Sequence, residues 1–152
     1  MARQIDDHNS DSLERLRAMA DRLSDDELAR PIDPPWTAAA LYAHIAFWDL
    51  FARARWLHAN EIGAALPVSI EDAPLEMVNQ AALGQWGAMP PRTAVHECLQ
   101  AAETVNRFLG ELDDAVVAGA VNEGRERLVD RSIHRLEHLQ VIESAFPHHR
   151  SP

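Results

Sequence analysis

The sequence predicts an all-α fold: a four-helix bundle with one long crossover connection and short additional helices. Apolar residues recur at spacings of three, four and seven along most of the chain, as they do on one face of a helix. Glycine (6) and proline (9) are scarce, and no run of β-branched residues alternates with polar ones. The chain of 152 residues has the size of one ordinary domain, so we expect residues 1–152 to form a single helical-bundle domain.

The first two long helices are predicted in the amino-terminal half. Capping-box patterns begin at Asp11 and at Ser24; the first opens a long helix, and the second opens a short turn that Pro31 ends. Thr37 is placed to cap a second long helix that reaches about Asn60. The apolar faces of these two helices comprise Leu13, Leu16, Met19 and Leu23, and then Leu41, Ile45, Trp48, Phe51 and Ala52.

The second half is predicted to hold one shorter helix and two long ones. The shorter helix begins at Asp72 and ends near residues 84–87, and periodic apolar residues over 95–112 mark a long helix. We interpret residues 113–124 as a connector and expect the last helix over about 125–146. About 30 residues with a helix of their own join the second and third long helices, which indicates a crossover. The apolar side of the shorter helix comprises Leu75, Val78, Ala82 and Trp86.

Charge and composition exclude several classes of function. With 14 basic and 24 acidic residues the formal net charge is −10, and such a chain repels phosphate backbones and anionic membranes. We therefore expect neither a nucleic-acid nor a membrane partner. All basic residues are arginine, so no lysine is present to form a Schiff base or a P-loop.

The single cysteine limits the cysteine-based sites that we expect, and the lack of a recognisable targeting segment bears on the expected location. Cys98 alone excludes an internal disulfide framework and a cysteine-rich zinc ribbon, and we expect it in the core. The amino terminus is polar and acidic, and no apolar stretch approaches the roughly 20 residues of a membrane span. The sequence thus predicts a cytoplasmic protein.

Three of the eight histidines are expected to face the interior. At 100° per residue, His44 lies in the middle of the apolar stripe of its helix. His134 and His138 lie one turn apart on a single face, which Val141 and Ala145 share. Buried imidazoles need partners for both nitrogens, and a divalent metal ion would bind three of them if their ring nitrogens converge. The alternatives are an incidental histidine pair and a hydrogen-bonded core His44.

The other histidines are weaker candidates. His58 lies about 21 Å along the helix from His44, too far to share an ion. His96 and Cys98 could form a nucleophile pair, but at a spacing of two residues on a helix their side chains point apart. The terminal histidines are His8, His148 and His149.

Two arginines could bind a substrate. Arg127 and Arg131 precede His134 by two turns and one turn of the expected last helix, where they could hold an anionic substrate. The alternative is that they are solvated or paired with Glu123, Asp130 or Glu137. We interpret Asp33 and Asp49 as capping and surface residues, not as catalytic acids.

Two histidine-containing signatures resemble those of the DinB/YfiT-like superfamily. The segment from Trp36-Thr37 through His44 to Trp48-Asp49 resembles its second-helix signature. His134-x-x-x-His138-x-x-x-Ile142 resembles its last-helix signature, and residues 23–36 (LSDDELARPIDPPW) are similar to its usual connector. The resemblance covers essentially all of residues 11–146. Here Glu137 precedes His138, whereas the family often places a second histidine beside the last ligand.

The resemblance implies a fold, a cofactor and an assembly. It implies an up-down-down-up bundle with a divalent metal ion (Zn, Ni, Fe or Mn) held by His44, His134 and His138. Relatives include mycothiol-dependent maleylpyruvate isomerase and bacillithiol transferases, in which the metal activates a low-molecular-weight thiol. Many members form homodimers, so we expect a homodimer here.

The leading hypothesis is a divalent-metal-dependent enzyme that acts on a small-molecule substrate, as a thiol-dependent S-transferase or isomerase. Three neutral imidazoles leave a doubly charged site with open positions, which can bring bound water to a pKa of about 7 or hold a thiolate. The same chemistry leaves a metal-dependent hydrolase open. The remaining alternative is a non-catalytic bundle that binds a metal or a small ligand.

Overall fold

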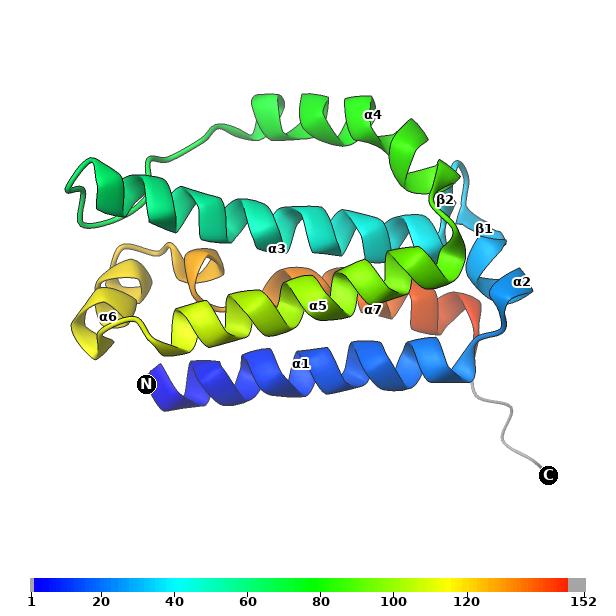
Figure 1. The fold of residues 1–152 in the computed structure, drawn as a ribbon, viewed down its shortest axis with the longest axis horizontal. Coiled ribbons are helices and arrows are strands. Elements are labelled where there is room, and N and C mark those ends of the chain that lie inside the picture. The colour runs from blue at the N-terminus through cyan, green and yellow to red at the C-terminus, as the bar shows by residue number, and fades with distance from the viewer. Residues whose placement is uncertain (1, 148–152) are drawn as a thin grey trace.

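The computed structural model describes residues 2–147 and confirms the all-α bundle. Its four long helices are α1 (Ala2–Arg22), α3 (Ala38–Glu61), α5 (Pro91–Gly110) and α7 (Ser132–Ala145). In Figure 1, α1 and α7 run in one direction and α3 and α5 in the other, which gives the up-down-down-up order. No helix among the described residues is long and apolar enough to cross a membrane.

The long connection between α3 and α5 is the predicted crossover. It carries α4 (Asp72–Ala88), which lies along α3 on the outside of the bundle (Figure 1). The other short elements are α2 (Asp25–Ala29), the antiparallel strands β1 (Pro31–Asp33) and β2 (Trp36–Thr37), α6 (Asp114–Asn122) and a 3₁₀ turn (Glu126–Leu128).

Local capping explains where α2 and α3 begin. Ser24 and Glu27 form the predicted capping box, each side chain bonding the other residue's backbone N–H. The Thr37 hydroxyl accepts a 3.0 Å hydrogen bond from the Ala40 N–H, as predicted. Residues 38–46 of α3 are all buried, because α5, α2, α4 and α7 pack around this helix. The central helix therefore holds His44 in a rigid environment.

Several predicted boundaries were wrong because tertiary contacts override local signals. The first helix begins at Ala2, not at Asp11, since the buried Ile5 belongs to a core cluster with Trp56 and Val105. The expected connector over 113–124 contains α6, which buries two of its residues against the same cluster.

The last helix and two apolar faces also differ from expectation. α7 begins at Ser132, and the segment expected to form its first two turns is a 3₁₀ turn followed by irregular turns. On α7, Val141 is 39% exposed and Ala145 is exposed, while Arg135, Leu139 and Ile142 form the buried stripe. On α4, Val78 is exposed, and the half-buried Asn79 faces the bundle instead.

Candidate metal centre

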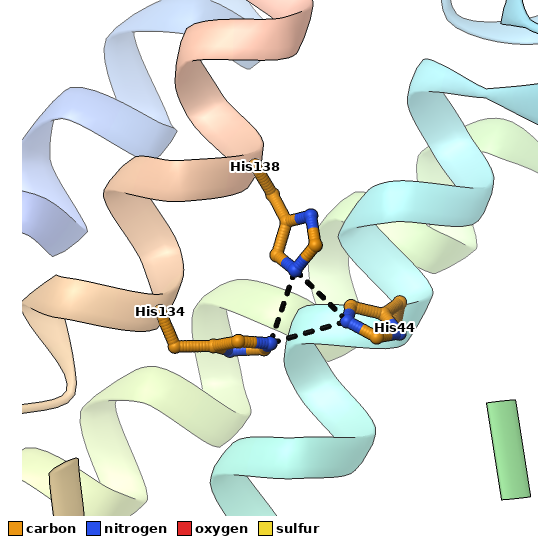
Figure 2. Close-up of side chains that lie close together, drawn as sticks. All are labelled: His44, His134 and His138. Carbon is orange, nitrogen blue, oxygen red and sulfur yellow. Dashed lines mark hydrogen bonds between the residues drawn. The ribbon is translucent and has the colours of Figure 1, made fainter. Parts of the chain in front are cut away.

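Three histidine side chains from two helices converge on one point. His44 comes from α3, and His134 and His138 come from consecutive turns of α7 (Figure 2). The Nε2 atom of His44 lies 3.1 Å from that of His134 and 3.0 Å from that of His138, and the last two are 3.1 Å apart. The structure thus brings together the three histidines that the sequence singles out.

Hydrogen bonds within the trio cannot satisfy all three nitrogens. Each Nε2 carries either a proton or a lone pair, so at least one of the three contacts sets two protons or two lone pairs against each other. A cation between them would accept all three lone pairs. Two nitrogens about 2.1 Å from one ion lie about 3.0 to 3.4 Å apart at ordinary coordination angles. The observed separations fit such an ion, and the three residues could hold a metal.

Burial keeps these imidazoles neutral. Desolvation, followed by the charges of His138 and Arg131, lowers the pKa of His44 to about 3. Burial, followed by the guanidinium of Arg131, holds the pKa of His134 well below its ordinary value, and burial also lowers the pKa of His138. Metal binding requires neutral imidazole, so the trio is ready to coordinate at neutral pH.

Two indole rings enclose His44. Trp36 and Trp86 contact its imidazole edge-on, with ring centroids 5.4 and 5.0 Å away. Its Nδ1 is buried and has no hydrogen-bond partner among residues 2–147. Ring packing, and not a hydrogen bond, therefore fixes the direction of Nε2.

The histidines open onto a cavity of about 550 Å³. His134 and His138 are half-buried and line it, so they face this cavity and not the closed core that the sequence had suggested. The volume suits a small molecule. Its walls come from one face of α3, from α4, from the loop after α3, from the segment before α7 and from the first turns of α7. The lining residues are His44, Trp48, Phe51, Ala52, Arg55, Ser69, Ile70, Leu75, Asn79, Gly124, Arg125, Glu126, Arg127, Leu128, Arg131, His134 and His138.

Arg127 and Arg131 both line this cavity, although neither belongs to α7. Arg127 forms an exposed ion pair with Glu137, one of the partners considered for it. Arg131 donates from Nε to Asp49 at 2.9 Å and from Nη1 to the Arg127 carbonyl at 2.8 Å. Both guanidinium groups reach the cavity while already holding protein partners.

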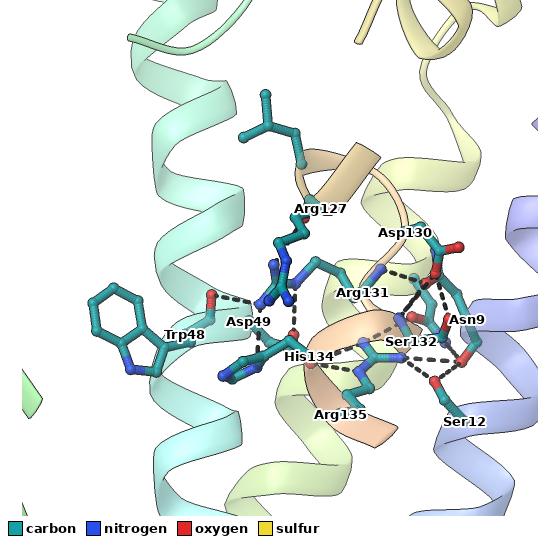
Figure 3. Close-up of polar contacts among 12 residues, drawn as sticks. Asn9, Ser12, Trp48, Asp49, Arg127, Asp130, Arg131, Ser132, His134 and Arg135 are labelled. Carbon is teal, nitrogen blue, oxygen red and sulfur yellow. Dashed lines mark hydrogen bonds and ion pairs between the residues drawn. The ribbon is translucent and has the colours of Figure 1, made fainter. Parts of the chain in front are cut away.

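Asp49 is fully buried, so its interpretation as a surface residue was wrong. Its carboxylate accepts hydrogen bonds from Arg131 Nε and, at 2.8 Å, from Arg135 Nε (Figure 3). Arg135 also donates to the Asn9 carbonyl, the Ser12 hydroxyl and the Asn106 side chain. This buried network joins α1, α3, α5 and α7 and holds the two histidine-bearing helices in register.

Sequence reasoning missed Asn9, Arg135 and Arg55. Asn9 and Arg135 carry no local signal, because their partners lie on other helices. Arg55 could have been found, since it lies eleven residues after His44 and therefore only about 20° from it around the helix.

The remaining histidines lie apart from the trio. His58 is exposed, with its Nδ1 3.8 Å from Glu61, and His8 contacts Asp130 at 3.2 Å. His96 is exposed whereas Cys98 is fully buried as predicted, so they form no nucleophile pair. Asp33 is exposed on β1, and His148 and His149 lie outside the described residues.

Comparison with known proteins identifies a family. The family model described as the DinB superfamily matches residues 9–142, which include all three converging histidines. No curated protein and no solved structure gives a significant match.

Proposed function

The chain belongs to the DinB superfamily, and we propose that it is a divalent-metal-dependent enzyme whose ion is held by His44, His134 and His138. The observation that carries this proposal is the convergence of three neutral Nε2 atoms at mutual distances of 3.0 to 3.1 Å. The ion (Zn, Ni, Fe or Mn) would act as a Lewis acid that lowers the pKa of a bound water or thiol.

The residues around the histidines provide an apolar wall, a link between α3 and α4, and positive charge. Trp48 and Phe51 line the cavity beside His44 and give this part of it an apolar wall. Trp48 also donates from Nε1 to the Asn79 side chain at 2.8 Å, which ties α4 to α3 across the cavity. The guanidinium of Arg131, 3.5 Å from Nδ1 of His134, adds positive charge that favours an anionic reactant near the histidines.

Within this class, we propose a thiol-dependent S-transferase or isomerase that uses a low-molecular-weight thiol. The resemblance to thiol-using relatives supports this choice, and so does the positive lining of the cavity, which favours a thiolate. Monitoring conjugation of an electrophile such as 1-chloro-2,4-dinitrobenzene to cysteine, with and without chelator, tests it. Ester hydrolysis without any thiol requirement would favour the hydrolase instead.

The decisive experiment concerns the metal itself. Elemental analysis of untagged protein as purified and isothermal titration with Zn²⁺ or Ni²⁺ should give one ion per chain. His44→Ala, His134→Ala and His138→Ala should each abolish this binding. His58→Ala is the matched control, because His58 is an exposed histidine of the same helix. If His44→Ala and His58→Ala bind metal equally well, the assignment of the ligands is wrong.

We also propose that the protein is a homodimer, as the resemblance implies. Exposed apolar side chains on the outer face of α3, Phe47, Leu50 and Leu57, would gain from being covered. Light scattering at micromolar concentration checks the assembly, and a monomer there would contradict it.

A further inference from the structure

The cavity concentrates positive charge in an acidic protein. Its lining includes four arginines, Arg55, Arg125, Arg127 and Arg131, and one acidic residue, Glu126. The whole chain carries a formal charge of −10. The cavity lining is therefore net positive, whereas the chain as a whole is net negative. This contrast indicates that the cavity requires these cations.

Two of the four arginines are already neutralised by carboxylates. Arg131 is paired with the buried Asp49, and Arg127 with Glu137. Arg55 and Arg125 form no ion pair with any of the described residues, 2–147. They are the cations whose charge is left for a ligand.

The loop after α3 holds these two guanidinium groups next to each other. Arg55 donates from Nη2 to the Val68 carbonyl at 2.7 Å, and Arg125 donates from Nη2 to the adjacent Pro67 carbonyl at 2.6 Å. Each contact uses one of five N–H donors, so most of the donors remain available. The Nε of Arg55 is buried from solvent and has no partner among the described residues.

The electrostatics of Arg55 agree with this placement. Burial, followed by the charges of Arg125 and Arg131, lowers its pKa. A cation held beside two others and partly desolvated is unfavourable unless an anion joins it. An anion that accepted hydrogen bonds from both guanidinium groups would compensate for the lost solvation.

The pair lies at a defined distance from the histidines. Arg55 follows His44 by eleven residues on the same face of α3, a rise of about 16 Å. Trp48 and Phe51 line the cavity between them and offer no charge. A ligand that reaches both ends must be elongated, with an uncharged middle.

We propose that Arg55 and Arg125 form a binding site for an oxyanion, a carboxylate or a phosphate, at the end of the cavity away from the histidines. The site anchors an elongated anionic substrate so that its other end reaches the histidine trio. Anion binding by the arginine pair does not depend on the proposed function, whereas the role of the anion as a substrate rests on it.

The first experiment uses metal-free protein, so that a metal cannot bind the anion. Isothermal titration with inorganic phosphate and with succinate should show saturable binding by the wild type, with the stronger probe identifying the oxyanion. Arg55→Gln and Arg125→Gln should each weaken it at least tenfold, the loss expected for a charge-assisted hydrogen bond. Arg107→Gln, which removes the same charge from an exposed position on α5, should bind as the wild type does. Circular dichroism verifies that each variant is folded.

Two readouts separate a binding role from a merely structural one. Arg55→Lys keeps the positive charge but loses the planar guanidinium with its several donors. It should therefore fold normally and bind the anion more tightly than Arg55→Gln but more weakly than the wild type. In ¹⁵N-detected spectra the Arg55 Nε–H signal should shift on addition of the anion. Equal affinity in the wild type, Arg55→Gln and Arg107→Gln, or no anion binding in any of them, would overturn the proposal.

A second titration links the two ends of the cavity. With Zn²⁺ present, a nine-carbon dicarboxylate should bind more tightly than succinate, because only the longer chain reaches both the arginines and the histidines. His44→Ala, which removes one of the proposed metal ligands, should abolish this gain. If the wild type binds succinate but gains nothing from the longer dicarboxylate, the metal assignment is contradicted and the anion site is not. If the wild type does not bind succinate, the anion site is contradicted.

Discussion

Arg135 and Asp49 form an ion pair in which neither side chain exposes any surface to solvent, with Arg135 Nε 2.8 Å from Asp49 Oδ2. Removing one partner of a buried pair leaves a charge without compensation, at a cost of about 3 to 5 kcal/mol. Asp49 also compensates Arg131, so its loss leaves two cations unpaired. We expect Asp49→Leu to lower the free energy of unfolding by about this amount, measured by urea denaturation.

Two comparison variants isolate the cause. Asp49→Leu combined with Arg135→Met removes both charges of the fully buried pair and leaves only Arg131 without its carboxylate, so it should recover part of the loss. Arg15→Met breaks the exposed pair between Arg15 and Glu143 and should hardly change stability. An Asp49→Leu variant as stable as Arg15→Met would contradict the role of this network.

The sequence was informative where function depends on local periodicity. The spacing of His134 and His138 and the place of His44 on an apolar stripe identify the three as candidates, and the family resemblance adds the expectation that they share one ion. Thr37 could be predicted as a cap because its partner, the Ala40 N–H, is three residues away. In each case a short stretch of chain contains the whole signal.

The buried network could not be predicted in this way. Asp49 lies about 140° from His44 around α3, which suggests a solvent-facing residue on an ordinary amphipathic helix. However, α3 is packed on several sides, and the partners of Asp49 lie 82 and 86 residues further along the chain. Similarly, a regular helix before His134 was a fair extrapolation, but Asn9 from α1 binds the backbone at Arg131 and fixes a later start.

The second prediction concerns the stability of the metal-free protein at acidic pH. His44 has a folded-state pKa of about 3 against an ordinary value of 6.5, so the unfolded chain takes up the proton first as the pH falls. The resulting stability is present above pH 6.5 and is lost as the pH falls toward 3. For His44 the loss between pH 7 and pH 5 is about 2 kcal/mol in metal-free protein. Urea denaturation at both values measures it.

The matched variants for this measurement are His44→Gln and His58→Gln. His44→Gln should make the metal-free protein less sensitive to acid, whereas His58→Gln should behave as the wild type because His58 is exposed. Equal acid sensitivity of the two variants would show that burial of His44 does not govern the response.

The third prediction concerns the thiol of Cys98. Burial raises its pKa, and the side chain is inaccessible in the folded protein. At about pH 8 we expect iodoacetamide to leave native protein unmodified over a time in which urea-unfolded protein reacts completely. Mass spectrometry reads this directly, because the chain has one cysteine. Rapid modification under native conditions would show that the core around α5 opens readily.

The last prediction tests how a residue remote from the histidines positions them. Asn9 is buried, and its Oδ1 accepts hydrogen bonds from the backbone N–H groups of Arg131 and Ser132, at 2.7 and 3.2 Å. It therefore caps α7 from another helix, and His134 stands on the first turn of α7. Asn9→Ala should lower the free energy of unfolding by about 2 kcal/mol. It should also weaken Zn²⁺ binding by about tenfold, the lower end for groups that orient metal ligands.

Asn9→Asp distinguishes positioning from general stability. Its carboxylate keeps the acceptor for the two N–H groups and favours the positive end of α7, but it loses the donor that bonds the Val129 carbonyl. Zn²⁺ affinity should therefore return close to that of the wild type even where stability recovers only in part. Ser10→Ala, an exposed change on the same helix, is the control and should alter neither quantity. If Asn9→Ala lost stability but bound Zn²⁺ as the wild type does, the register of α7 would not depend on this cap.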